Sequence, residues 1–230
     1  MQWSNRWTIG PREYLERRRL RRAALRYAGH GWAVTPGACP AGHRLGCGRA
    51  DCRITACRPA LESWQDDPGT DPPRVARWWR RRPYPVLLVT GASFDVLDVP
   101  AAVGLRTLGA VRLHTDVLGA AEPDARGPVA VTPAGRWMFL VRPGADLRPE
   151  LGSCPDVRHH GRGSWIPAAP SRTPEGPVRW AVPPEQTGWQ LPDSTVVQAM
   201  LLDALAALGR RPQAATVFVP RQVSTARRAA

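Results

Sequence analysis

Residues 84–110, YPVLLVTGASFDVLDVPAAVGLRTLGA, decide most of the fold. The two apolar runs on either side of residues 91–93 predict two strands, because aliphatic residues favour strands and a Gly and Ser cluster favours a turn. The end of the stretch, residues 101–110, predicts a short helix. Two acids, Asp95 and Asp98, interrupt the second run. They are three residues apart, so on a regular strand they point to opposite faces.

The rest of the chain mixes helical and strand-like periodicity, which predicts an α+β fold with a mixed sheet flanked by helices. Helices are expected at residues 11–28, 70–82 and 193–208. Strands are expected at 32–35, 128–141 (a hairpin), 164–167, 177–182 and 215–219. We expect one domain over residues 1–209, and we expect the final strand and a disordered basic tail within residues 210–230.

The net charge is +13, and all 32 basic residues are arginine. Such a field favours nucleic acid or another polyanion, whereas the absence of lysine is also typical of a GC-rich genome. The faces of the 11–28 helix that lie outside its apolar stripe are rich in arginine and form either a solvated surface or a phosphate-contacting one. These arginines are Arg12, Arg17, Arg18, Arg19, Arg21, Arg22 and Arg26.

The sequence predicts a cytoplasmic protein without a membrane segment, because it has neither a long apolar run nor a signal peptide. In a reducing compartment the cysteines of the 38–58 loop are metal ligands or free thiols rather than disulfides. A structural zinc ion would organise this loop, with Cys47, Cys52 and Cys57 as ligands and His43 or Cys39 as the fourth. The alternative is a set of reduced thiols in a surface loop. Cys154, far away in sequence, is expected to be a structural thiol.

Asp98 has two interpretations from its local sequence. Two acids separated by one residue on a strand can hold two divalent metal ions. Here the position two beyond Asp98 is Pro100, which offers no side-chain ligand. Asp98 can instead cap the helix that begins after Pro100.

Several stretches, in this order, resemble the N-terminal domain of bifunctional DNA primase/polymerases (Prim-Pol) of the archaeo-eukaryotic primase superfamily, particularly short actinobacterial forms. The resemblance covers about residues 20–182. The stretches are ALRYAGHGWAVTPGACP, TDPPRVARWW, LLVTGASFDVLDVPAAVGL, GPVAVTPAGRWMFLV and DVRHHGRGSWIPAAPS followed by GPVRW. The resemblance implies a DNA primase/polymerase fold whose acids hold Mg or Mn and whose histidine helps to hold a nucleoside triphosphate.

The resemblance places two acids of this chain at the family's catalytic positions, Asp98 in the first motif and Asp156 in the third. Two other positions depart from the pattern. The second acid of the first motif is Pro100, and the histidine of the second motif is Trp137, which follows Arg136.

Other residues of these motifs are candidates for nucleotide or DNA contacts. Trp137 can stack on a base or lie in the core. The basic segment around Asp156 can receive a triphosphate, or it can be a solvated loop with Asp156 as its counter-charge. The candidates are Arg136, Trp137, Arg158, His159, His160, Arg162 and Arg172.

Three functions follow from these observations. The first is a degenerate Prim-Pol domain that binds DNA, another nucleic acid or a nucleotide with weakened or lost nucleotidyl transfer. The second is an active template-dependent primase/polymerase that uses Asp98 and Asp156. The third is a regulatory or protein-interaction module. In either of the first two, a helicase or other replication protein would be a separate partner.

Overall fold

The fold is described from a computed structural model over residues 10–41, 44–46, 58–61, 64–65, 69–80, 82–118 and 125–209. Within them the chain combines helices with antiparallel sheets, which confirms the α+β class. The helices are α1 (Pro11–Gly29), α2 (Pro72–Trp78), α3 (Ala101–Leu118), α4 (Pro149–Gly152), the 3₁₀ helix η1 (Pro184–Thr187) and α5 (Ser194–Ala207).

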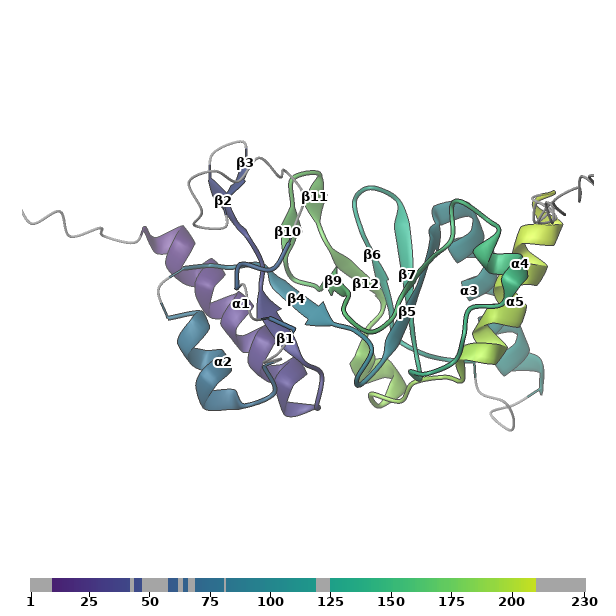
Figure 1. Cartoon of the computed structure of the whole chain (residues 1–230), viewed down its shortest axis with the longest axis horizontal. Helices are drawn as coiled ribbons and strands as arrows, with labels where there is room; N and C mark the ends of the chain where they lie inside the picture. The colour runs from purple at the N-terminus through teal and green to yellow at the C-terminus, as the bar shows by residue number, and fades with distance from the viewer. Residues whose placement is uncertain are drawn as a thin grey trace, which may run out of the picture.

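The strands form two main sheets (Figure 1). The smaller has the order β1 (Val34–Pro36), β4 (Val86–Val89), β9 (Trp165–Pro167). The larger has the order β12 (Arg179–Val182), β6 (Val129–Val131), β7 (Arg136–Val141), β5 (Asp95–Pro100), β8 (Arg158–His160). Two hairpins, β2 (Cys39–Ala41) with β3 (Arg44–Gly46) and β10 (Arg172–Thr173) with β11 (Gly176–Pro177), complete the set. Every strand pair among the described residues is antiparallel, whereas the sequence had suggested a mixed sheet.

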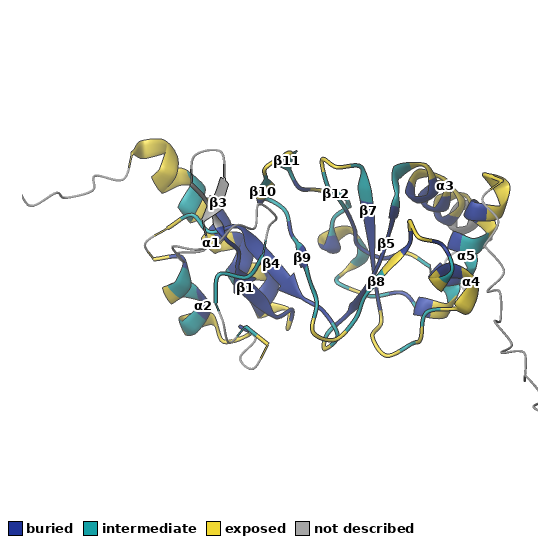
Figure 2. Ribbon diagram, turned by 45° about the horizontal axis from the view of Figure 1, so that its top comes forward, coloured by how far each residue is buried: buried dark blue, intermediate teal, exposed yellow. Residues whose placement is uncertain are grey.

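Helices cover the two sheets from opposite ends of the molecule (Figure 1). Helices α1 and α2 lie beside the smaller sheet, and α3, α4 and α5 lie beyond the larger one. One core joins residues of α1 and of both sheets, such as Tyr27, Leu88 and Met138. A second core lies between the larger sheet and helices α3 and α5. The strands at the centre of both sheets are accordingly buried (Figure 2).

Helix α1 follows the prediction closely. Pro11 stands at its first turn, and Leu20, Ala23, Ala24, Tyr27 and Ala28 form the buried stripe. The Tyr27 hydroxyl donates to the Ala169 carbonyl at 2.5 Å and accepts from Trp180 Nε1 at 3.0 Å, so α1 is tied to the chain on both sides of β10 and β11. Burial raises the pKa of Tyr27 above its ordinary value.

The chain passes from the smaller to the larger sheet at Thr90 and Gly91, where the turn predicted at residues 91–93 is confirmed. Gly91 has a φ of +92°, and a Cβ there would lie 2.2 Å from Arg162 Cα. Thr90 donates its hydroxyl to the Gly161 carbonyl at 2.6 Å. Residues 90–91 lead from β4 into β5, and residues 161–162 lead from β8 into β9, so the contacts between these two connections hold β5 and β8 in place relative to each other.

Two helices differ from the predicted lengths. Helix α3 continues to Leu118 rather than ending near residue 110, because it packs against α5 and this tertiary contact outweighs the weak propensity of Gly109. Helix α2 ends at Trp78, because Trp79 turns into the core and donates its indole N–H to the Tyr84 carbonyl at 2.6 Å. The hairpin at 128–141 and the helix at 193–208 are confirmed as β6 with β7 and as α5.

Some predictions lie outside the described residues. These include the strand at 215–219, the basic tail and the zinc ligands His43, Cys47, Cys52 and Cys57; Cys39 is described only in its backbone. Cys154 is a buried free thiol, as expected. In the described part of the chain no helix is long and apolar enough to cross a membrane.

Candidate active site

The two acids of β5 lie on opposite faces of the larger sheet, as their spacing predicted. Asp98 shares its face with Val96, which belongs to the core common to both sheets. Asp95 shares its face with Leu97, which packs beneath α3 and α5. Both acids are buried, with 4% of Asp95 and 5% of Asp98 exposed. Neither acid therefore faces solvent, and Asp95 lies within the sheet as a buried structural acid.

Both carboxylate oxygens of Asp98 have partners from neighbouring strands. Arg136 Nε donates to Oδ1 at 2.8 Å, and His160 Nε2 lies 3.2 Å from Oδ2. The strand register explains the arrangement. Arg136 lies opposite Pro100 on β7 and His160 lies opposite Val96 on β8, so all point to the Asp98 face.

Arg136 makes two further contacts. Its Nη2 donates to the Asp98 carbonyl at 2.9 Å and to the Asp156 carbonyl at 2.8 Å. The guanidinium thus bridges the two residues that the sequence comparison had assigned as catalytic acids. Its side chain is only 20% exposed, so the ion pair with Asp98 is largely shielded from water.

His160 is held from its other side by Ser164, whose Oγ lies 3.0 Å from Nδ1. In the tautomer that carries its proton on Nε2, His160 donates to the Asp98 carboxylate. In that same tautomer Nδ1 accepts from the Ser164 hydroxyl. This pair of contacts orients His160 toward Asp98.

Asp95 and His159 form a second, separate pair on the opposite face. Asp95 Oδ2 accepts from the Gly144 N–H at 3.1 Å and lies 3.4 Å from His159 Nε2. Asp95 Oδ1 and His159 Nε2 are buried and have no hydrogen-bond partner. His159 is therefore directed away from Asp98, although it neighbours His160 in sequence.

The segment predicted as a basic loop is partly a strand, because residues 158–160 form the edge strand β8 beside β5. Asp156 lies in the exposed turn before this strand. Arg158 lies opposite Asp98 in the ladder and is exposed, and Arg162 and Arg172 are exposed as well. Of the predicted nucleotide-contacting residues, the structure brings Arg136 and His160 into contact with Asp98.

Trp137 lies in the core rather than on a nucleotide-binding surface. It is 9% exposed and belongs to the cluster beneath α3 and α5. A Cβ added at Gly104 of α3 would lie 2.5 Å from its ring, so α3 packs directly on the indole. Successive residues of a strand face opposite sides. Because Arg136 points toward Asp98, Trp137 must point away, and it is not available to stack on a base.

The family model for bifunctional DNA primase/polymerase, N-terminal (Prim-Pol), matches residues 24–194. The chain belongs to the Prim-Pol family. A search of curated proteins gave no match. The matched residues contain every element of the two main sheets and the whole Asp98 site.

The site of this Prim-Pol protein does not fit a divalent metal ion as it stands. Metal ions of this class need several oxygen ligands, and paired sites need acids from more than one position. Asp98 has both oxygens engaged by Arg136 and His160, and Pro100 supplies no ligand. In the described residues no group of three or more His, Cys, Asp or Glu side chains could hold a metal.

Sequence reasoning did not find the partner of Asp98. Arg136 is 38 residues away along the chain, and its contact depends on the β5 and β7 register, in which Pro100 faces Arg136. Ser164 was not singled out either. A strand alternation that places Trp137 in the core would have indicated that Arg136 points to the opposite face.

Proposed function

We propose that this Prim-Pol protein binds nucleic acid and nucleotides and that its nucleotidyl transfer is weakened or lost. The contact between Arg136 and Asp98 carries the proposal. It places a permanent positive charge on the acid that the family resemblance assigns to metal binding.

The chemistry of the site supports this proposal. Arginine stays protonated at any physiological pH, so the guanidinium is a fixed counter-charge for Asp98. A divalent cation at Asp98 would have to displace Arg136 or lie beside it, and either arrangement is unfavourable. The next expected acid position is Pro100, which supplies no carboxylate to compensate.

Family membership and charge support the binding half of the proposal. The chain carries a net charge of +13, and exposed arginines lie on α1, β8 and β10. We infer a DNA or other nucleic-acid partner and a nucleoside triphosphate ligand in the cytoplasm. A helicase or replication protein acting on the same nucleic acid is a further proposed partner.

A structural zinc ion in the 38–58 loop remains part of the proposal. Cys47, Cys52 and Cys57 with His43 or Cys39 supply donors of the kind that zinc prefers. Elemental analysis of the purified protein tests it directly, since one zinc per chain is expected.

The central test is nucleotide incorporation on primed and unprimed single-stranded DNA with Mg or Mn. We expect trace incorporation or none by the wild type, while DNA binding is retained in the same buffer. Calorimetric titration with Mn is expected to show no binding that depends on Asp98. Asp98→Ala and Asp156→Ala are the matched variants.

The outcomes separate the three functions. Incorporation by the wild type well above trace level that both variants lose would contradict the proposal and establish an active primase/polymerase. Indifference to DNA at low salt would contradict the binding half and favour an interaction module. DNA binding that weakens as salt rises is the result expected for a phosphate-contacting protein.

A further inference from the structure

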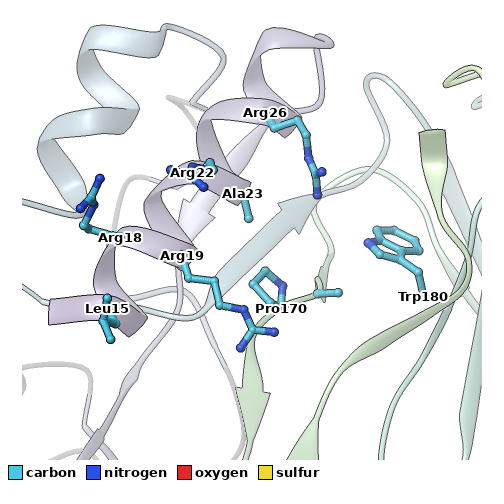
Figure 3. A pocket seen from close by; sticks show the side chains of 9 residues that line it. Leu15, Arg18, Arg19, Arg22, Ala23, Arg26, Pro170 and Trp180 are labelled. Carbon is cyan, nitrogen blue, oxygen red and sulfur yellow. The ribbon is translucent and has the colours of Figure 1, made fainter. Parts of the chain in front are cut away.

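The strongest unassigned feature is a cavity of about 550 Å³ on the outer flank of helix α1. Arginines of α1 line one side, and Pro170 and Trp180 line the other (Figure 3). The arginines are Arg18, Arg19, Arg22 and Arg26. Figure 3 shows Arg19 and Arg26 extending from α1 toward the side that carries Pro170 and Trp180. We call this feature the α1 groove.

The groove keeps an excess of positive charge. Arg26 is paired with Glu185 at 2.8 Å, and Arg19 lies 3.8 Å from Glu16, with both pairs largely exposed to solvent. Within the described part of the chain no carboxylate lies within 4.0 Å of Arg22. Among the residues that the structure describes, Glu16 and Glu185 are the acids that pair with these four guanidinium groups. Exposed pairs of this kind are weak, so an incoming anion can compete for them.

The spacing of the arginines suits a run of phosphates rather than a single one. Arg19 and Arg26 are seven residues apart, which is about 10 Å along a helix at about 1.5 Å per residue. Stacked nucleotides place one phosphate every ~3.4 Å along a strand. The strip thus spans about three phosphate-to-phosphate steps, and guanidinium forks are well suited to binding phosphates.

The opposite wall supplies an aromatic surface. Trp180 is partly exposed, and its Nε1–H is fixed by the bond to the Tyr27 hydroxyl at 3.0 Å. Aromatic side chains beside a cationic groove bind unpaired bases by stacking, which a duplex does not offer. Insertion of α1 into a membrane does not fit, because its apolar stripe of Leu20, Ala23, Ala24 and Tyr27 is already buried in the core.

We propose that the α1 groove is a binding site for single-stranded nucleic acid, in which the arginines contact successive phosphates and Trp180 stacks on a base. The proposal deepens and rests on the proposed nucleic-acid binding function. It divides the arginines of α1 into two sets. Those of the groove bind, whereas Arg17, which donates to the Arg80 carbonyl, and the exposed Arg21 lie outside the cavity.

The test is the salt dependence of binding to a short 5′-fluorescein-labelled oligothymidylate, measured by anisotropy between about 0.05 and 0.2 M NaCl. The groove variant is Arg19→Ala with Arg22→Ala. The matched control is Arg21→Ala with Arg106→Ala, which removes the same charge from exposed positions on α1 and α3. Each lost phosphate contact on a single strand reduces the steepness of the plot of log affinity against log salt concentration by ~0.7. We expect the groove variant to lose about 1.4 from the slope and about tenfold or more in affinity at low salt, with little change in the control.

Trp180 is tested separately. Trp180→Leu is expected to weaken binding about 5- to 100-fold through the loss of stacking, and Trp180→Phe is expected to recover most of it. Tyr27→Phe removes the hydrogen bond to Trp180 but keeps the indole, so it controls for a purely structural effect. Circular dichroism establishes that each variant is folded.

The two proposals fail in different ways. Wild-type binding that the groove variant retains with an unchanged slope would overturn the α1 groove alone. Equal losses in the groove and control variants would also overturn it, because they would indicate the general field of the protein. Tighter binding to the matching duplex or to a polyglutamate peptide would overturn the single-strand assignment. Absence of binding to any nucleic acid at low salt would overturn the proposed function itself.

Discussion

The Asp98 site and the α1 groove use the same residue type in opposite ways. Arg136 is largely buried, with 20% of its side chain exposed, and it donates to a carboxylate and to two backbone carbonyls. Arg18, Arg19 and Arg22 are exposed on one flank of a helix and line a cavity. Arg136 makes intramolecular contacts with its donors, whereas Arg18, Arg19 and Arg22 expose their charge to solvent.

The difference shows that arginine content alone does not locate binding. A guanidinium whose donors are satisfied by the protein stabilises the fold, and one that has few partners can contact a phosphate. In this Prim-Pol protein Arg136, which pairs with Asp98, belongs to the first kind. Mutations at the Asp98 site are therefore expected to change stability, and mutations in the α1 groove are expected to change binding.

Loss of Arg136 should give the largest effect. Arg136→Ala removes the cationic partner of the buried Asp98 carboxylate and leaves His160 as its remaining side-chain partner, which is expected to destabilise the protein by about 3 kcal/mol. Urea unfolding followed by tryptophan fluorescence measures this change. Arg136→Lys keeps the charge but cannot make all three contacts, so an intermediate loss is expected.

The size of this loss shows whether Arg136 stabilises the fold. A loss of unfolding free energy below about 0.5 kcal/mol in Arg136→Ala, the range of ordinary surface substitutions, would contradict a stabilising role for its contacts. The groove variant Arg19→Ala with Arg22→Ala should lie within that range, because both side chains are exposed. The two arginine sets would then differ in stability as well as in binding.

Tyr27 provides a stability test at the α1 groove, because its hydroxyl accepts from Trp180 in the groove wall. Tyr27→Phe leaves the Trp180 Nε1–H and the Ala169 carbonyl without their partner, which is expected to cost about 2 kcal/mol in unfolding free energy. Tyr14→Phe, at an exposed position of the same helix, is the control and should change little.

The pH dependence of the Tyr27 effect has a definite sign. Burial raises the pKa of Tyr27 in the folded protein, so the hydroxyl favours folding below its ordinary value of 10.0, and this contribution is lost as the pH rises above it. The wild type should therefore lose stability above pH 10, and Tyr27→Phe should lose less. An identical alkaline dependence in both proteins would contradict the assigned burial of the hydroxyl.

The sequence predicted the elements better than their contacts. Helix α1, the hairpin of β6 and β7, and α5 follow from local periodicity, and they form where expected. Helix α3 is longer than predicted because it packs against α5, and local propensity does not encode that contact.

The site required information that no local pattern contains. The motif comparison aligned Trp137 with a histidine position, but the residue that reaches Asp98 is its neighbour Arg136. Which of two adjacent residues faces the acid depends on strand register, and a shift of one residue exchanges the faces. The sequence did indicate that Asp95 and Asp98 face opposite sides, because that follows from spacing within one strand.

Arg142 tests whether burial or pairing with an aspartate determines how much unfolding free energy Arg136 contributes. Arg142 donates to Asp193 at 3.1 Å, but both side chains are exposed, at 63% and 41%. Arg142→Ala should therefore cost about 0.5 kcal/mol or less, although it removes an arginine–aspartate pair like that of Arg136. A loss comparable to that of Arg136→Ala would show that pairing, not burial, sets the effect.

Asp193 should matter slightly more than its arginine, because it caps α5. Its Oδ1 accepts from the Thr195 N–H at 2.8 Å, so Asp193→Ala is expected to cost about 1 kcal/mol at neutral pH. Hydrogen bonds from the Thr195 side chain and backbone lower the pKa of Asp193 below its ordinary value of 3.8. This contribution is therefore present above pH 3.8 and is lost as the pH falls through the depressed value. Asp193→Ala should lack this acid dependence in urea unfolding. Arg142→Ala should keep most of it, because the hydrogen bonds from Thr195 lower the pKa of Asp193 more than the exposed Arg142 does.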